Sequence, residues 1–315
     1  MIDFRYHLVS LIAVFLAVAL GIVIGTTQLN GPVLTNLQGQ VSALQTDKRA
    51  LEDQSRELQA QLDDVGSFDE AVGPALVEGT LAGRSVVLVV GSEDVVPDVL
   101  EGLTALLGSA GATVTGTIRL TPGYGDPAND AAVEAYVTGP GRPADLAPAD
   151  GGDPAGLTAD LLAEVLMVPP ADAGTAGPVP ASATSSVLAG LEELGVLSRD
   201  TSSVTPADYA VLLTAGVLTD ENALPRTEAL VQLVTALDRR GSGAVAAGDP
   251  TTVDDGGLLR ALRADTSVSA VVSTVDNVTV PAGRISTVLA LAAESRGTTG
   301  AYGSGEDTQP VPPAP

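Results

Sequence analysis

Three carboxylates that follow predicted strands are the side chains of this sequence best placed to do chemistry. Asp94, Asp249 and Asp276 each come soon after a short apolar run that predicts a buried strand. Because parallel strands end at the same edge of a sheet, where ligands gather, the three would form a cluster able to bind a cation. The simpler interpretation is that each caps a helix by accepting hydrogen bonds from free backbone N–H groups. The residues alone leave both interpretations open.

The other side chains used in catalysis or metal binding are almost absent. The sequence has no cysteine, its only histidine is His7, and its only methionines are Met1 and Met167. Disulfides, thiolate metal sites and a Ser-His-Asp arrangement within one chain are therefore excluded. Residues 91–94, after the first predicted strand, read GSED and match neither a dinucleotide-binding motif nor a P-loop. We expect a protein that is not an enzyme and holds no cofactor.

The composition narrows the classes of partner. The chain has 315 residues, and its formal net charge is −24. Such a surface repels phosphate backbones, so the sequence predicts no nucleic-acid partner. Hydrophobic residues make up 45% of the chain, which is enough to bury a sizeable core. Aromatic residues are only 3%, too few for the stacking platforms typical of sugar-binding enzymes.

An apolar run near the N-terminus predicts a membrane anchor. Residues 8–25 carry no charge, and as a helix they would extend about 27 Å, just enough to cross the hydrocarbon layer. The alternatives are a buried helix of a soluble domain and a cleaved signal peptide. No polar stripe supports the first; Asp3 beside Arg5, and a poor cleavage site at residues 25–27, disfavour the second. We expect an uncleaved transmembrane helix at residues 8–26.

The positive charges predict the orientation of this helix. Arg5 precedes the span, and no lysine or arginine follows until Lys48. The positive-inside rule then places residues 1–7 in the cytoplasm and the bulk of the chain outside it. The sequence therefore predicts a single-pass protein of the cell membrane whose later domains are extracytoplasmic.

A heptad repeat follows the anchor and predicts a coiled coil at residues 33–66. The a positions are Leu34, Val41, Lys48, Ser55 and Leu62, and the d positions are Leu37, Leu44, Leu51, Leu58 and Val65. Pro32 and Gly66 flank the repeat, as expected for helix boundaries. The helix either lies on its own domain or pairs with a second copy. We favour a parallel homo-oligomer, in which Lys48 and Ser55 weaken the seam but help to fix its register.

Strands alternate with helices in an extracytoplasmic domain predicted at residues 80–296. Apolar runs predict strands at residues 85–90, 112–120, 209–214, 243–248 and 268–274. Helical spacing predicts helices at residues 94–110, 157–168, 185–194, 222–239, 254–263 and 281–296. This alternation predicts an α/β fold: a flavodoxin-like, mostly parallel five-stranded sheet in the order 2-1-3-4-5, with helices on both faces. Residues 297–315 are rich in Gly, Ser and Pro and predict a disordered tail.

Two stretches of the sequence resemble one known family. The first is residues 1–26, and the second is a set of motifs near the C-terminus. These motifs are STVDN at 273–277, PAGR at 281–284, VLAL at 288–291 and GAYG at 300–303. Together they resemble the family of mycobacterial copper transport protein B (MctB), whose members are actinobacterial envelope proteins. The likeness covers the chain to about residue 303 and singles out Asp276, Asn277, Gly283, Arg284 and Tyr302.

The resemblance implies a role in copper transport or copper homeostasis at the cell envelope. Only this resemblance implies copper as a ligand, and it identifies no metal-binding residue. A SteB-like branch of the family is linked to cell separation and to a membrane partner. The alternative function is therefore a coiled-coil scaffold that binds another envelope protein.

Overall fold

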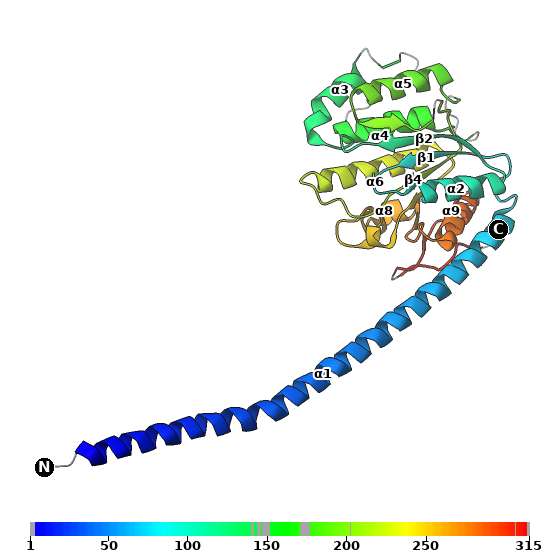
Figure 1. Cartoon of the computed structure of the whole chain (residues 1–315). Coiled ribbons are helices and arrows are strands. Elements are labelled where there is room, and N and C mark those ends of the chain that lie inside the picture. Colours follow the sequence, from blue (N-terminus) through cyan, green and yellow to red (C-terminus); the bar gives the residue numbers. More distant parts are fainter. Residues whose placement is uncertain are drawn as a thin grey trace. The chain divides into compact units, whose positions relative to one another are not determined.

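In the computed structural model, the chain has a long N-terminal helix followed by an α/β domain of alternating strands and helices (Figure 1). The structure describes residues 4–139, 142–143, 146, 152–170, 177–201, 203–305 and 307–313, without the side chains of residues 26–35. The chain divides into two compact units, Met1–Val65 and Gly66–Pro315. Each unit is described by itself below.

Helix α1, Phe4–Val77, begins with the predicted anchor. Its segment Phe4–Gly25 is 22 residues long, apolar enough to cross a bilayer, and not buried by other parts of the chain. A helix of this length extends about 33 Å. The predicted helix ends at Pro32 and Gly66 are wrong, because both residues lie inside α1. An interior proline costs about 3 kcal/mol and an interior glycine about 1 kcal/mol, local costs that this helix of 74 residues tolerates.

The apolar heptad positions of the first unit are exposed. The exposed fractions of these side chains range from 52% to 67% for Leu37, Val41, Leu44, Leu51, Leu58, Leu62 and Val65. A partner that covered these apolar side chains would stabilise the helix by about 25 cal/mol for each Å² of apolar surface removed from water. Pairing of this helix with a second copy stays a prediction.

The second unit alternates strands and helices after the end of α1. The strands are β1 Ser85–Val90, β2 Thr113–Leu120, β3 Leu197–Arg199, β4 Tyr209–Leu213, β5 Ala244–Ala247, β6 Ser273–Val275 and β7 Ala301–Tyr302. The helices are α2 Pro97–Ser109, α3 Asp130–Thr138, α4 Pro154–Leu166, α5 Ala181–Glu193, α6 Ala223–Arg240, α7 Leu258–Ala264, α8 Thr266–Ser269 and α9 Pro281–Glu294. Short 3₁₀ helices, η1 Pro127–Asn129 and η2 Pro250–Val253, lie in the loops.

The strands form one mixed sheet, which has seven strands among the described residues, in the order β3-β2-β1-β4-β5-β6-β7. The prediction of an α/β fold is confirmed, but that of a five-stranded, flavodoxin-like sheet is not. The five expected strands lie together at its centre, and two unexpected ones form the edges. β3 pairs antiparallel with β2, and β7 pairs parallel with β6. Strands of three and two residues are too short to show a hydrophobic period, so the sequence did not indicate them.

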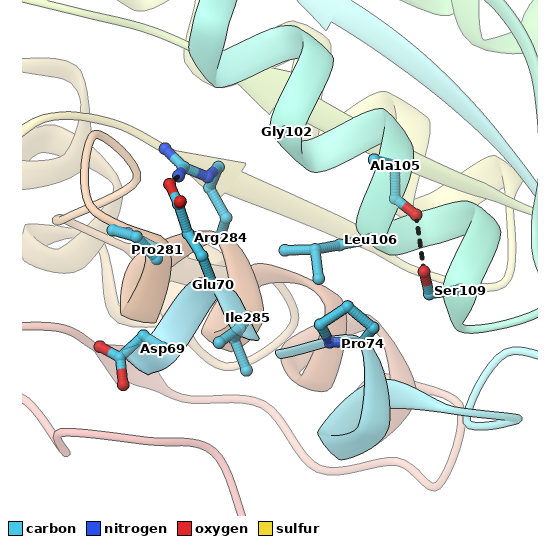
Figure 2. A pocket seen from close by; sticks show the side chains of 10 residues that line it. All are labelled: Asp69, Glu70, Pro74, Gly102, Ala105, Leu106, Ser109, Pro281, Arg284 and Ile285. Carbon is cyan, nitrogen blue, oxygen red and sulfur yellow. Dashed lines mark hydrogen bonds and ion pairs between the residues drawn. The ribbon is translucent and has the colours of Figure 1, made fainter. Parts of the chain in front are cut away.

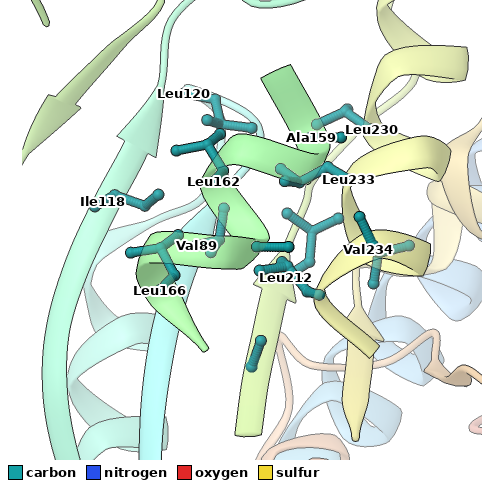
Figure 3. Close-up of a cluster of buried hydrophobic side chains, with 14 of the residues drawn as sticks. Val89, Ile118, Leu120, Ala159, Leu162, Leu166, Leu212, Leu230, Leu233 and Val234 are labelled. Carbon is teal, nitrogen blue, oxygen red and sulfur yellow. The ribbon is translucent and has the colours of Figure 1, made fainter. Parts of the chain in front are cut away.

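Helices bury both faces of the sheet. Along β1, Val86, Leu88 and Val90 point into a core shared with α2, α9 and the end of α1. Val87 and Val89 point into the opposite core, which α4, α5, α6 and α7 cover. Figure 3 shows Val89 in this core with Leu162 and Leu166 of α4 and Leu233 and Val234 of α6. Because successive side chains of a strand alternate between faces, a strand covered on both faces must be apolar throughout. This explains the uninterrupted run SVVLVV.

The predicted strand at 268–274 begins too early. Residues 266–269 form α8, and β6 covers only Ser273–Val275. Asp265 causes the difference, because its Oδ1 accepts hydrogen bonds from Ser267 N at 2.8 Å and Val268 N at 3.4 Å. This N-cap starts a helical turn where the β-branched composition favoured a strand.

Part of the predicted disordered tail belongs to the sheet. Ala301 and Tyr302 pair with Thr274 and Val275 of β6, and Gln309 N donates to Ala301 O at 2.9 Å. The composition of residues 297–315 suggested disorder, but pairing with an existing strand supplies partners for the backbone groups.

The packing of Leu162 gives a direct test of the core. Leu162 lies fully buried on α4 against the sheet, whereas Leu224 on α6 is 70% exposed. Leu162→Ala is expected to lower the free energy of unfolding by about 3 kcal/mol, because it leaves a cavity. Leu224→Ala is the matched control and should change it by less than about 0.5 kcal/mol. Urea denaturation of the detergent-solubilised chain measures both, and equal effects would contradict this core.

Candidate functional site

Asp249 and Asp94 lie in loops at the carboxyl edge of the sheet. Asp249 is the N-cap of η2, and its Oδ1 accepts from Thr251 N at 2.8 Å. Its Oδ2 accepts from Gly216 N at 2.8 Å, which ties the loop after β5 to the loop after β4. Asp94 is exposed in the loop after β1 and also lies beside Gly216. The capping interpretation is thereby confirmed for Asp249.

Asp276 has a different environment from the other two predicted carboxylates. Its side chain is fully buried, and its Oδ2 lies 2.9 Å from Nη1 of Arg263, whose side chain is 18% exposed. Among the described residues, no three His, Cys, Asp or Glu side chains lie close enough together to hold a metal ion. The buried charge of Asp276 is therefore balanced by an arginine, as a buried carboxylate requires.

Arg263 and Asp276 together hold the C-terminal motifs on the sheet. Arg263 Nε donates to Thr274 Oγ1 at 2.8 Å, and its Nη2 donates to Tyr302 O at 3.3 Å, so one guanidinium joins β6 to β7. On the other side, Asp276 accepts from Ser304 N at 2.7 Å and from Gly305 N at 3.3 Å. Hydrogen bonds to an ionised group of this kind are stronger than those between neutral groups.

Glycine at position 303 is required by this arrangement. Its φ is 128°, a conformation that other residues rarely adopt. A Cβ at Gly303 would also overlap the carboxylate of Asp276. The GAYG motif, which the family resemblance singled out, therefore lets the backbone pass close to a buried charge.

Asn277 and Gly283 form a second close approach, at the start of α9. A Cβ at Gly283 would overlap the backbone carbonyl of Asn277, so only glycine fits there. The carbonyl of Asn277 accepts from Val280 N at 3.1 Å, which closes the turn before Pro281 begins the helix. Pro281 is suited to this first helical position, where its missing N–H costs nothing.

Arg284 borders a pocket of about 200 Å³ between the end of α1 and helices α2 and α9 (Figure 2). Its side chain is 11% exposed, and its Nη2 lies 3.4 Å from Oε1 of Glu70, which is 66% exposed. Gly102 of α2 leaves room for the guanidinium, since a Cβ there would lie 2.9 Å from Nε. An ion pair this long with an exposed partner contributes little energy, so Arg284 serves mainly to pack α9 against α2.

Tyr302 completes the set of motif residues. It lies on β7 with 1% of its surface exposed. Burial raises the pKa of its hydroxyl, and the nearby charge of Glu294 raises it further. Gly300 allows the ring to sit there, because a Cβ at 300 would lie 2.7 Å from the hydroxyl oxygen. All five motif residues are thus held in the protein interior or at close backbone contacts.

Apolar side chains narrow the crevice where doubly wound sheets usually bind ligands. In this sheet the strand order reverses between β1 and β4, next to Gly91. Among the described residues, the side chains of Tyr124 and Leu230 line the hollow beside Gly91 and leave it too small to hold a water molecule. Burial strongly raises the pKa of the Tyr124 hydroxyl, so the ring stays neutral there.

Two buried acidic residues were not predicted. Glu294 of α9 is 8% exposed, and its Oε1 accepts from Ser273 N at 2.7 Å. Its Oε2 is buried without a hydrogen-bond partner among the described residues. Asp238 of α6 accepts from Ala244 N at 3.2 Å nearby. A sequence signal existed, because Glu294 follows Ala290 and Leu291 by four and three residues on the apolar face of its helix.

Burial changes the protonation of this acidic pair. It raises the pKa of the Glu294 carboxyl to about 8, an effect that the negative charge of Asp238 increases. It also raises the pKa of Asp238 to about 6. A neutral carboxyl avoids the cost of burying an unpaired charge, which explains why an orphaned oxygen is tolerated.

These features fit the class of membrane-anchored α/β proteins. An apolar helix long enough to span a bilayer precedes an α/β domain, and the five motif residues position the backbone and neighbouring elements. The family described as "Copper transport outer membrane protein, MctB" matches residues 1–313. The chain belongs to this family, which is not a known enzyme class.

Relatives from mycobacteria are similar over their whole length. Proteins named "Copper transporter MctB" from Mycobacterium bovis and Mycobacterium tuberculosis are 32% identical over 319 residues, covering 99% of this chain and 99% of each relative. The protein of the same name from Mycobacterium leprae is 32% identical over 315 residues, covering 97% of both chains. The likeness thus includes both the anchor helix and the α/β domain.

The buried ion pair predicts a large effect of Asp276→Ala. The variant is expected to lower the free energy of unfolding by about 3 kcal/mol, because Arg263 would keep its charge without its partner. Hydrogen exchange of the amides at 304 and 305 should also become faster. Asp255→Ala is the control, since Asp255 pairs with Arg260 where their side chains are 93% and 58% exposed. Loss of that surface pair should lower the free energy of unfolding by less than about 1 kcal/mol. A similar decrease in stability in both variants would contradict the assignment.

The acidic pair predicts that stability falls as pH rises. The pKa of Glu294 in the folded state, about 8, lies above its ordinary value of 4.5. The contribution of the protonated Glu294 side chain to the free energy of unfolding is therefore complete below pH 4.5. It is lost as the pH rises towards 8, by at most about 1.4 kcal/mol per pH unit. Urea denaturation between pH 5 and pH 8 measures this slope. Glu294→Gln should flatten it, and the exposed Glu228→Gln should not; an unchanged slope in Glu294→Gln would refute the assignment.

Proposed function

We propose that this protein is a membrane-anchored, non-enzymatic envelope protein with a role in copper transport or copper homeostasis. The observation that carries the proposal is the family match over residues 1–313, with relatives named as copper transporters at 32% identity over 99% of the chain. The anchor spans residues 8–26, the N-terminus is cytoplasmic, and the α/β domain is extracytoplasmic. The placement of Arg5 before the span and Lys48 well after it supports this orientation.

The chain's chemistry favours a role through assembly or a partner. Copper sites favour Cys, His and Met side chains, and beyond residue 7 the only such side chain is Met167, which is fully buried. The described part of the chain has one helix apolar enough to span a bilayer, which cannot enclose a wide pore, and a sheet with open edges cannot cross lipid. Movement of copper would therefore require several copies or another membrane protein, with copper as cargo.

The exposed heptad seam supports a second candidate function. Its apolar side chains are more than half exposed in a single chain, which suits a coiled-coil scaffold that holds envelope proteins together. In this alternative the protein acts in cell separation through a membrane or envelope partner. Both candidates involve an assembly that this seam could hold together, so one genetic experiment can compare them.

Deletion of the gene is expected to raise the copper content of the cells and their sensitivity to copper. Elemental mass spectrometry and growth in graded copper measure these effects, and the wild-type gene should restore both. A seam variant, Leu44→Asp with Leu51→Asp, should fail to restore them because it prevents pairing. Ala60→Asp, an exposed position outside the seam, is the matched control and should restore them.

The outcome of this experiment separates the two functions. Unchanged copper content and sensitivity in the deletion strain would refute the copper role. Unseparated cells with normal copper handling would support the scaffold instead.

A further inference from the structure

The positions that flank the heptad seam are almost all uncharged. Those at e and g between residues 38 and 61 are Gln38, Gln40, Gln45, Asp47, Glu52, Gln54, Gln59 and Gln61. In coiled coils these positions usually carry the charges that choose the partner. Glutamine there avoids repulsion between two copies of a chain whose net charge is −24. The flanks therefore suit a second copy, but they provide few charges to fix its register.

The two charged flanking residues bracket Lys48, the only lysine of the chain. Lys48 occupies an a position in the middle of the seam, and its Nζ lies 3.3 Å from Oε1 of Glu52 on the next turn. The side chain of Lys48 is 76% exposed and that of Glu52 is 48% exposed, so neither is covered in a single chain. Asp47 precedes Lys48 at the g position and is also exposed.

We propose that residues 37–65 form a parallel, two-stranded interface with a second copy of this chain, and that Lys48 fixes its register. In the aligned pair, each Lys48 ammonium lies between Glu52 of its own helix and Asp47 of the second copy. This inference rests on the coiled coil of the proposed function and names its partner and its register device. Anchors that cross the same membrane in the same direction place equal residues at equal heights, which makes the pair parallel.

A shifted register would lose this charge arrangement. Moving one helix by a heptad places Lys48 opposite Val41 or Ser55, where the flanking residues of the second copy are Gln40 or Gln54. A lysine that is partly buried at the interface would then lack its second carboxylate. A single polar a position is known to specify register and strand number at some cost in stability.

The interface ends where the α/β unit begins to cover α1. Gly73 packs so closely on α9 that a Cβ there would lie 3.0 Å from Cδ1 of Ile285. Val77 is fully buried in the same core. The next seam positions, Asp69 and Val72, are partly buried, so the continuous run of exposed seam positions ends at Val65.

Disulfide trapping in native membranes tests the interface, because the chain contains no cysteine. Leu44→Cys and Leu51→Cys place single thiols at d positions, and Thr46→Cys is the control on the opposite face. Each d variant should form a disulfide dimer at least tenfold more than Thr46→Cys. Co-expressed Leu44→Cys and Leu51→Cys chains should give almost no mixed dimer. In the aligned pair these two thiols lie seven residues, or about 10 Å, apart along the helix, which is too far for a disulfide, whereas a shift of one helix by a heptad would bring them together.

Substitutions at Lys48 test the register device in the same assay. Lys48→Leu should raise the mixed dimer at least fivefold, and Arg49→Leu, outside the seam, should not change it. Lys48→Glu should reduce the Leu44→Cys dimer at least fivefold. Adding Asp47→Lys and Glu52→Lys to it should restore most of the product, because the charges are then exchanged.

Two negative results have different meanings. If d positions cross-link no more than Thr46→Cys, the coiled coil of the proposed function is itself refuted. If they cross-link but the Lys48 variants leave the register and yield unchanged, the Lys48 assignment is overturned while the proposed function stands.

Discussion

Burial of the central sheet on both faces is the constraint on which the α/β unit depends. Every residue of β4 and β5 is buried, as are five of the six residues of β1. Within such a layer a charged side chain must either find a partner or become neutral. Both solutions occur in this protein: Asp276 pairs with Arg263, and the raised pKa of Glu294 favours its neutral form at neutral pH.

The C-terminal motifs of the family follow from the same constraint. Asp276 binds the backbone that follows β7, and Gly303 and Gly283 remove side chains that would collide with Asp276 and Asn277. Arg284 packs between α9 and α2 beside a small pocket (Figure 2). These residues act as positioning groups for the backbone and for neighbouring elements.

The function proposed for this chain follows from its organisation more than from a reactive centre. A bilayer-length apolar helix, an exposed heptad seam and an acidic α/β unit suit a protein that acts where it is anchored. The relatives' names connect the family to copper transport. A chain that has no cysteine and only one histidine, His7, has few ligands that copper prefers, so it would handle copper more readily in an assembly than alone.

The sequence by itself determined the features that depend on composition along one segment. The apolar run of the anchor, the heptad spacing and the central strands can each be recognised locally, because their hydrophobic patterns are long or uninterrupted. Only the tertiary structure decided the short edge strands β3 and β7, since strands of that length exist only by pairing with a neighbour. It also decided which carboxylates are buried. Asp94 and Asp276 both follow strands, yet one is exposed and the other fully buried. Burial depends on which distant segments cover a residue, and neighbouring residues in the sequence do not contain that information.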